Sequence, residues 1–112
     1  MIIENIGSKI FKDVKYFKLN IFKDERGSFK ETFNQEIEEF ISTDIHFIQD
    51  NESFSKYGVL RGLHYQKNPK EQSKLVRVSR GKIQDVVVDI RKGSATYAKW
   101  ESFDLSDENN EM

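Results

Sequence analysis

The chain is 112 residues long, which is enough for one domain with a modest core and too short for two. Its 18 basic and 19 acidic residues leave a formal charge of -1, so the charge favours neither nucleic acid nor an anionic membrane as a partner. The lack of cysteine excludes disulfides and thiolate metal sites, and no apolar run approaches membrane-spanning length. We therefore expect a single cytoplasmic domain over residues 1–112.

The first half of the chain predicts a strand, a hairpin and a helix, in that order. Residues 14–22 alternate partly between apolar and polar side chains, as a strand does. A polar turn ending at Gly27, a residue that takes positive φ readily, makes residues 22–33 a β-hairpin. Asn34 is then a suitable N-cap for a short helix, whose apolar residues at i, i+3 and i+4 are Ile37, Phe40 and Ile41.

The second half of the chain predicts strands separated by polar or glycine-containing turns. The expected strands cover residues 46–50, 57–66, 74–80, 83–90 and 99–105. Short strands at intervals of about ten residues are typical of an all-β sandwich or barrel. The one short helix does not change that class.

The central motif runs from Gly58 to Gln66, and within it Arg61, Gly62 and His64 fall close together. In a regular strand Arg61 and His64 would point to opposite faces, because side chains alternate. A glycine inside a strand often marks a bulge or a close backbone approach, and a bulge at Gly62 would bring both side chains to one face. That face would suit an anionic substrate that gains or loses a proton, although a lone histidine is more often a hydrogen-bonded core or rim residue.

Proton transfer is the use of His64 that the sequence favours. Histidine titrates near neutrality, as a general base should, provided that another group fixes its tautomer. If the strands on either side of the polar turn at 67–72 pair antiparallel, Lys74 lies near His64 and can stabilise an oxyanion. Taken alone, Lys74 is an ordinary strand-edge lysine. Asp85 or Asp89 could orient His64, or both could lie on a solvent face, which we favour.

A metal site is not predicted. Metal-binding histidines on a strand usually stand two apart, so that both reach one ion, and a carboxylate completes the set. The position two after His64 is Gln66, and the second histidine is the distant His46. We therefore expect no metal.

Basic and aromatic residues suggest a site for a phosphorylated ligand. Arg26, Arg61 and Lys74 would suit phosphate oxygens, since arginine offers a planar fork of donors and lysine a point charge. Phe22 and Phe29 flank the turn at Arg26. They could stack on a base or fill the core, and aromatics in hairpins more often fill the core.

Two amides bracket Asp50 on one face of an expected strand. The side chains of Gln49 and Asn51 could read the edge of a ring through paired donors and acceptors. The alternative is an ordinary solvated strand.

Several ordered stretches together resemble one family, dTDP-4-dehydrorhamnose 3,5-epimerase. The matching stretches are residues 22–31, 49–51, 58–66, 74–77, 85–91, 94–100 and 105–106. The resemblance covers nearly the whole chain in the same order, and several motifs in order are far more specific than any one of them.

The resemblance implies a cupin-type jelly roll with one short helix, usually a homodimer with exchanged N-terminal strands, that acts without cofactor or metal. It implies epimerisation of dTDP-4-dehydro-6-deoxyglucose at C3 and C5, which gives dTDP-4-dehydrorhamnose for cell-surface polysaccharide. A histidine matching His64 would remove the protons, and a lysine matching Lys74 would steady the enolate. The residues implied in substrate binding are Phe22, Arg26, Phe29, Glu31, Gln49, Asn51 and Arg61.

The departure from the family pattern is at the end of the chain. Family members continue beyond the point matching Met112, and their further part carries a tyrosine proton donor, a second histidine and an aspartate that orients the base. The jelly roll is therefore expected to be incomplete at its C-terminus, and open strand edges predict a dimer or higher oligomer. Two alternatives stay open: a nucleotide-sugar-binding fragment without turnover, and a single-centre epimerase or ketoisomerase on a related dTDP-sugar.

Overall fold

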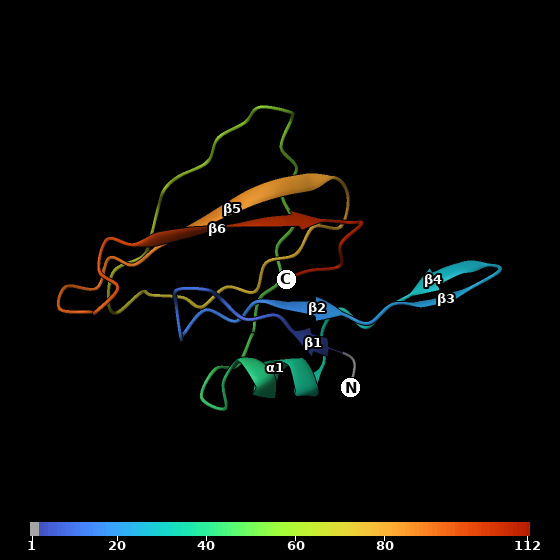
Figure 1. The fold of residues 1–112 in the computed structure, drawn as a ribbon, viewed down its shortest axis with the longest axis horizontal. Helices are drawn as coiled ribbons and strands as arrows, with labels where there is room; N and C mark the ends of the chain where they lie inside the picture. Colours follow the sequence, from blue (N-terminus) through green and yellow to red (C-terminus); the bar gives the residue numbers. More distant parts are fainter. Residues whose placement is uncertain (1–2) are drawn as a thin grey trace.

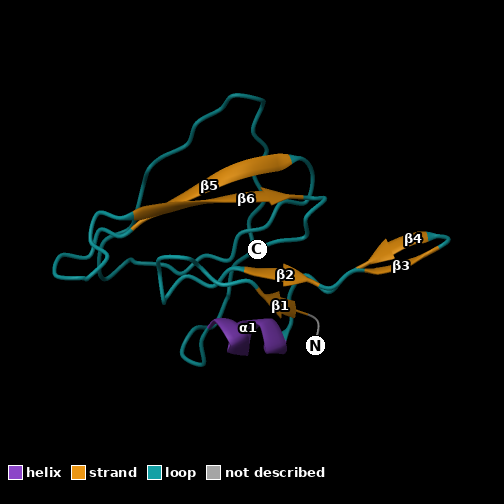
Figure 2. Ribbon diagram, in the orientation of Figure 1, coloured by secondary structure: helices purple, strands orange, loops and turns teal. Residues whose placement is uncertain are grey.

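The computed structural model describes residues 3–112, which form a mostly-β fold with one short helix (Figures 1 and 2). Within this range the strands form three two-stranded antiparallel ribbons, β1–β2, β3–β4 and β5–β6. The elements are β1 (Ile3–Asn5), β2 (Phe17–Leu19), β3 (Phe22–Asp24), β4 (Gly27–Phe29), α1 (Gln35–Ile41), β5 (Lys82–Val88) and β6 (Trp100–Ser106). The predicted class is confirmed at this level.

Local signals placed the hairpin turn and the helix correctly, although the return strand of the hairpin ends at Phe29 rather than at residue 33. Phe22 pairs with Phe29 across the β3–β4 hairpin, and Gly27 has a φ of +140°, where glycine is favoured. Asn34 caps α1, because its side-chain oxygen accepts a hydrogen bond from the backbone N–H of Ile37 at 3.0 Å. Ile37 is fully buried and faces the core, as the apolar spacing predicts.

Two apolar clusters hold the molecule together. The first is Ile3, Phe17, Leu19, Ile37 and Met112, and the second is Val78, Phe103 and Leu105. The segment before β5 joins them, because Leu75 packs on the first cluster while Val76 packs on the second. These two neighbouring side chains therefore pack on different clusters, although the segment is not a strand.

The last residues of the chain extend the β1–β2 ribbon. The backbone of Met112 exchanges two hydrogen bonds with Phe17, at 2.8 and 3.1 Å, and Leu19 donates to the carbonyl of Asn110 at 2.8 Å. The Tyr16 hydroxyl donates to the Glu111 carboxylate, and burial, with this hydrogen bond second, raises the pKa of Tyr16 to about 12.

The strand predictions for 46–50, 57–66 and 74–80 are wrong. Throughout residues 46–80, all of which the structure describes, the backbone is irregular and no strand forms. A strand needs a neighbouring strand for its N–H and C=O groups, and an apolar pattern does not supply one. Much of this segment arches away from the β5–β6 ribbon as an open loop (Figure 1). No helix among residues 3–112 is long and apolar enough to cross a membrane.

Candidate active site

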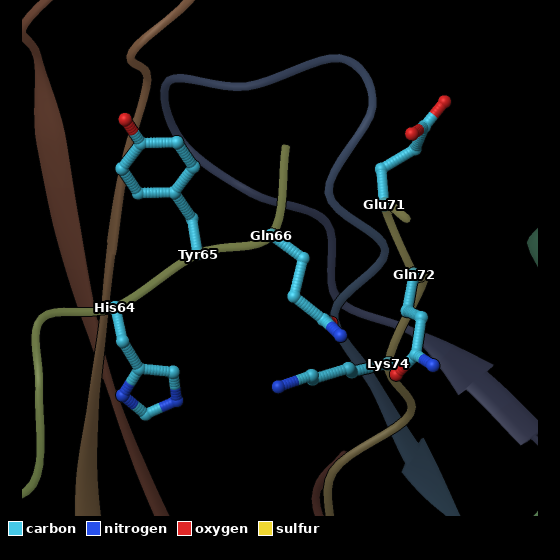
Figure 3. A pocket seen from close by; sticks show the side chains of 6 residues that line it. All are labelled: His64, Tyr65, Gln66, Glu71, Gln72 and Lys74. Carbon is cyan, nitrogen blue, oxygen red and sulfur yellow. The ribbon is translucent and has the colours of Figure 1, made fainter. Parts of the chain in front are cut away.

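His64 and Lys74 line the same hollow (Figure 3). The chain reverses between them through a turn in which the backbone N–H of Lys70 donates to the carbonyl of Lys67 at 2.7 Å. The hollow has a volume of about 270 Å³ and is lined by His64, Tyr65, Gln66, Glu71, Gln72 and Lys74. In Figure 3 the Lys74 ammonium extends toward the His64 ring, with the Gln66 amide beside it. The reversal, rather than the predicted pairing of two strands, brings them together.

This arrangement combines a proton acceptor with a fixed positive charge. A neutral imidazole can remove a proton from carbon next to a carbonyl, and an adjacent ammonium can stabilise the oxyanion that results. Sequence reasoning missed Glu71 and Gln72 as members of the site. The signal that could have found them was their position in the polar turn joining His64 to Lys74.

Arg61 lies outside the lining of this hollow. Its Nε donates to Ser55 Oγ at 2.9 Å and its Nη2 to the carbonyl of Phe54 at 3.3 Å, so the guanidinium is turned back along the chain. Gly62 has a φ of +93°, but the predicted bulge is absent, because no strand forms over residues 57–66. The expected shared face of Arg61 and His64 is not formed.

The β3–β4 hairpin forms a second hollow, of about 460 Å³, at the projecting end of the molecule (Figure 1). Phe22 and Phe29 both line it and are 56% and 64% exposed, so of the two alternatives open for these rings the core-filling one is wrong. Arg26 also lines it and forms a salt bridge of 2.6 Å with Asp24. The hydrogen bonds from Arg26 lower the pKa of Asp24. The hairpin thus offers two aromatic faces beside a guanidinium.

The remaining predicted binding residues form local pairs. The amide of Asn34 donates to Glu31 at 2.7 Å, and Gln49 donates to Asn51 at 3.3 Å. Gln49 and Asn51 therefore face the same side, as predicted. The structure does not gather the candidate residues at one place: they lie at the hairpin, at the 49–51 segment and at the hollow of His64, with Glu31 and Arg61 apart from these.

Asp89 does not orient His64 and does not lie on a solvent face. It is 7% exposed, and its carboxylate accepts hydrogen bonds from Ser94 and Thr96, each at 2.6 Å, and from Arg91 Nε and Nη2, each at 3.0 Å. These bonds, Arg91 first, hold the pKa of Asp89 well below its usual range. Asp89 thus holds together the loop that joins β5 to β6, and its hydrogen bonds with Arg91, Ser94 and Thr96 are called the clamp below. Asp85 is half-buried, and burial raises its pKa.

The donor set for a metal ion is poor. Among residues 3–112, no three His, Cys, Asp or Glu side chains gather where they could hold one. His46 is bound instead by Glu38, whose Oε1 lies 2.9 Å from His46 Nδ1.

Residues 8–112 match the profile of a family described as dTDP-4-dehydrorhamnose 3,5-epimerase. A protein of that name from Shigella flexneri is 53% identical over 106 residues, which are 94% of this chain and 59% of the relative. The one from Methanothermobacter thermautotrophicus is 56% identical over 89 residues, which are 80% of this chain and 48% of the relative. The chain thus spans roughly half to three fifths of the lengths of these relatives.

Solved structures agree with these relatives. The dTDP-6-deoxy-D-glucose-3,5-epimerase of Legionella pneumophila, in complex with dTDP-4-keto-L-rhamnose, superposes with a TM-score of 0.89 at 43% identity. That match covers 97% of this chain and 57% of the other. The dTDP-4-dehydrorhamnose 3,5-epimerase of Bacillus anthracis, with TDP and PPi bound, gives a TM-score of 0.89 at 41% identity, covering 97% of this chain and 62% of the other.

Proposed function

The chain belongs to the dTDP-4-dehydrorhamnose 3,5-epimerase family, and on that premise we propose that it carries the proton-transfer machinery of such an epimerase. The proposed reaction converts dTDP-4-dehydro-6-deoxyglucose to dTDP-4-dehydrorhamnose by inversion at C3 and C5. The observation that carries the proposal is the common hollow of His64 and Lys74. A sugar ring bound in this hollow would have an imidazole and an ammonium in its walls.

The proposed chemistry uses the ketone of the substrate. The 4-keto group acidifies the C–H bonds at C3 and C5, because the carbanion left by proton removal is delocalised onto the ketone oxygen. His64 takes the proton, and the Lys74 ammonium lies beside the oxygen as negative charge develops there. Return of a proton to the opposite face of the ring inverts the carbon.

The nucleotide part of the substrate is assigned to the remaining candidate residues. Phe22 and Phe29 expose aromatic faces on which a thymine base can stack, and Arg26 between them suits a diphosphate oxygen. Polar contacts are assigned to Glu31, Gln49, Asn51 and Arg61.

The proposed architecture is a single cytoplasmic domain of cupin-type jelly-roll form, assembled as a homodimer with exchanged N-terminal strands. The projecting hairpin supports this assembly, because its two phenylalanines are largely exposed in the single chain. Because the hairpin projects away from the hollow of His64 in the same chain, it can supply a nucleotide contact to a neighbouring subunit. Light scattering should show a dimer or higher oligomer, and a clean monomer would contradict the proposed assembly.

Deuterium uptake tests the proposed activity. The protein is incubated with dTDP-4-dehydro-6-deoxyglucose in D₂O, and the sugar is followed by NMR. The proposal predicts deuterium at C3 and C5 together with the product inverted at both carbons. Exchange and inversion at C3 alone would instead identify a single-centre epimerase or ketoisomerase.

A binding module without turnover is the second candidate. The observation in its favour is that the hairpin hollow, with Arg26 and the exposed Phe22 and Phe29, is separate from the hollow of His64 and Lys74. Calorimetry that detects binding of the dTDP-sugar, together with no deuterium uptake, would favour this candidate over the epimerase.

A further inference from the structure

Gly62 lies two residues before His64 and has a backbone conformation that L side chains rarely adopt. Its φ is +93°. Any residue with a Cβ is strained in this region, whereas glycine enters it freely. The residue before it is anchored, because Arg61 donates to Ser55 and to the carbonyl of Phe54. Gly62 is therefore the point where the anchored part of the segment meets the part that carries the proposed base.

The imidazole of His64 occupies the space that a side chain at position 62 would need. A Cβ on Gly62 would lie 2.9 Å from His64 Nδ1, 3.1 Å from its backbone N and 3.6 Å from Cε1. Nδ1 is thus the ring nitrogen closest to the missing side chain. The other nitrogen, Nε2, is left for the hollow that His64 shares with Lys74 (Figure 3).

We propose that Gly62 is a positioning residue for His64: by lacking a side chain it admits the Nδ1 edge of the ring and so directs Nε2 to the substrate. This inference rests on the proposed function, because it assigns His64 as the base. A methyl group at position 62 would push the ring out of the hollow without touching the substrate itself.

Gly58 provides a matched control within the same segment. Its φ is +82°, so an alanine there is strained in a similar way, but a Cβ would meet no described atom within 4 Å. Gly58→Ala therefore reproduces the backbone strain of Gly62→Ala without the contact to His64. The difference between the two variants isolates that contact.

The first test compares the rates of C3 proton exchange in the two variants. Because a displacement of about 1 Å can slow a reaction about a hundredfold, Gly62→Ala should lower kcat by about that factor. KM should change little, since nucleotide contacts are elsewhere, and Gly58→Ala should keep most of the wild-type rate. Equal losses in the two variants would overturn the inference.

The second test needs no activity. The chain has two histidines, so the ring-nitrogen NMR signals of His64 can be assigned by their retention in His46→Gln. Gly62→Ala should shift the His64 signals, and Gly58→Ala should leave them in place. Unshifted signals in Gly62→Ala would overturn the inference, whereas a wild-type protein without deuterium uptake would overturn only the proposed function.

A double-mutant cycle decides the case in which Gly62→Ala is poorly folded. Stability to urea is measured for each glycine variant with His64 and with His64→Ala. Removal of the ring should restore much of the stability lost in Gly62→Ala and none of that lost in Gly58→Ala. An absence of coupling between positions 62 and 64 would overturn the inference.

Discussion

The β5–β6 ribbon and the 46–80 segment have similar apolar sequence patterns but different structures. Each residue of β5 pairs across the ribbon, from Lys82 opposite Ser106 to Val88 opposite Trp100, and Asp89 clamps the turn. The 46–80 segment forms no strand, and many of its large apolar side chains are exposed. The difference shows that a partner for the backbone, rather than alternation of side chains, decides whether a strand forms.

The comparison also bears on function, because both candidate catalytic residues lie in the less supported segment. His64 and Lys74 are placed by a turn and by a few local contacts, whereas the ribbons and clusters on either side provide the rigid frame. Substitutions in the frame should therefore change stability, and substitutions of the side chains that line the hollow should change chemistry with little effect on stability.

The largest expected effect is on stability in the frame. Phe17 is fully buried in the first apolar cluster and its ring packs edge-to-face on Phe40. Phe17→Ala should lower the free energy of unfolding by about 3–5 kcal/mol, because it removes a buried ring and leaves a cavity. Urea denaturation followed by circular dichroism measures the change.

The matched control is Phe54→Ala in the other region. Phe54 is 83% exposed, so its removal should change the unfolding free energy by no more than about 0.5 kcal/mol. A loss as large as that of Phe17→Ala would show that the part of the segment around Phe54 is packed in solution, which would contradict the contrast between the two regions.

The next effect is on chemistry at the hollow. Lys74→Met keeps much of the side-chain volume but removes the charge, and should slow C3 exchange by about 10²–10³-fold, as loss of an oxyanion donor does. Lys70→Met is the control, because Lys70 lies in the adjoining turn but does not line the hollow. Equal rates for the two variants would refute the role assigned to Lys74.

A smaller effect is expected from the clamp of the β5–β6 turn. Asp89→Asn should lower the melting temperature by several degrees at neutral pH, because Asp89 accepts from Arg91, Ser94 and Thr96. The native pKa of Asp89 is lowered, so its contribution is full above the unfolded aspartate pKa of about 3.9 and is lost as the pH falls below it. The gap between wild type and variant should therefore narrow in acid, and a gap that stays constant would argue against the clamp.

The smallest effect is expected at Glu38, in the middle of α1. Glu38 contacts His46 Nδ1 at 2.9 Å and accepts from the backbone N–H of Phe47 at 3.0 Å, and the hydrogen bond with His46 is the main cause of its lowered pKa. Its contribution is present above the unfolded glutamate pKa of about 4.3 and is lost as the pH falls through the lowered native value. Glu38→Gln should shift the melting temperature less than Asp89→Asn does. Thermal unfolding measured between about pH 3 and pH 7, which spans the unfolded glutamate pKa of about 4.3, gives the change in melting temperature for both variants.

The sequence was sufficient for elements that carry a strong local pattern of their own. The hairpin, the helix capped by Asn34 and the two strands of the β5–β6 ribbon depend on turn residues and local periodicity. β1 was missed, because its three residues are too few to show an alternating pattern. The strands expected within 46–80 did not form although the pattern is suitable, since this segment has no paired neighbour in the described chain.

The sequence indicated which residues belong to the candidate site better than it indicated how they are arranged. The nearness of His64 and Lys74 follows from the polar turn between them, even without the expected strand pairing. The buried Asp89 was not predictable, because its burial depends on the fold of a turn around it. The sequence alone left two alternatives for Phe22 and Phe29, and the more common one, filling the core, is not realised because this hairpin projects from the body (Figure 1).

The most direct test of the central claim compares the two histidines of the chain. Deuterium uptake at C3 of dTDP-4-dehydro-6-deoxyglucose is measured for His64→Gln and His46→Gln, of which only the first alters a residue of the hollow. Loss of a general base should slow uptake by about 10²–10⁴-fold in His64→Gln, while His46→Gln should exchange like the wild type. Exchange that persists in His64→Gln would contradict the assignment of His64 as the base.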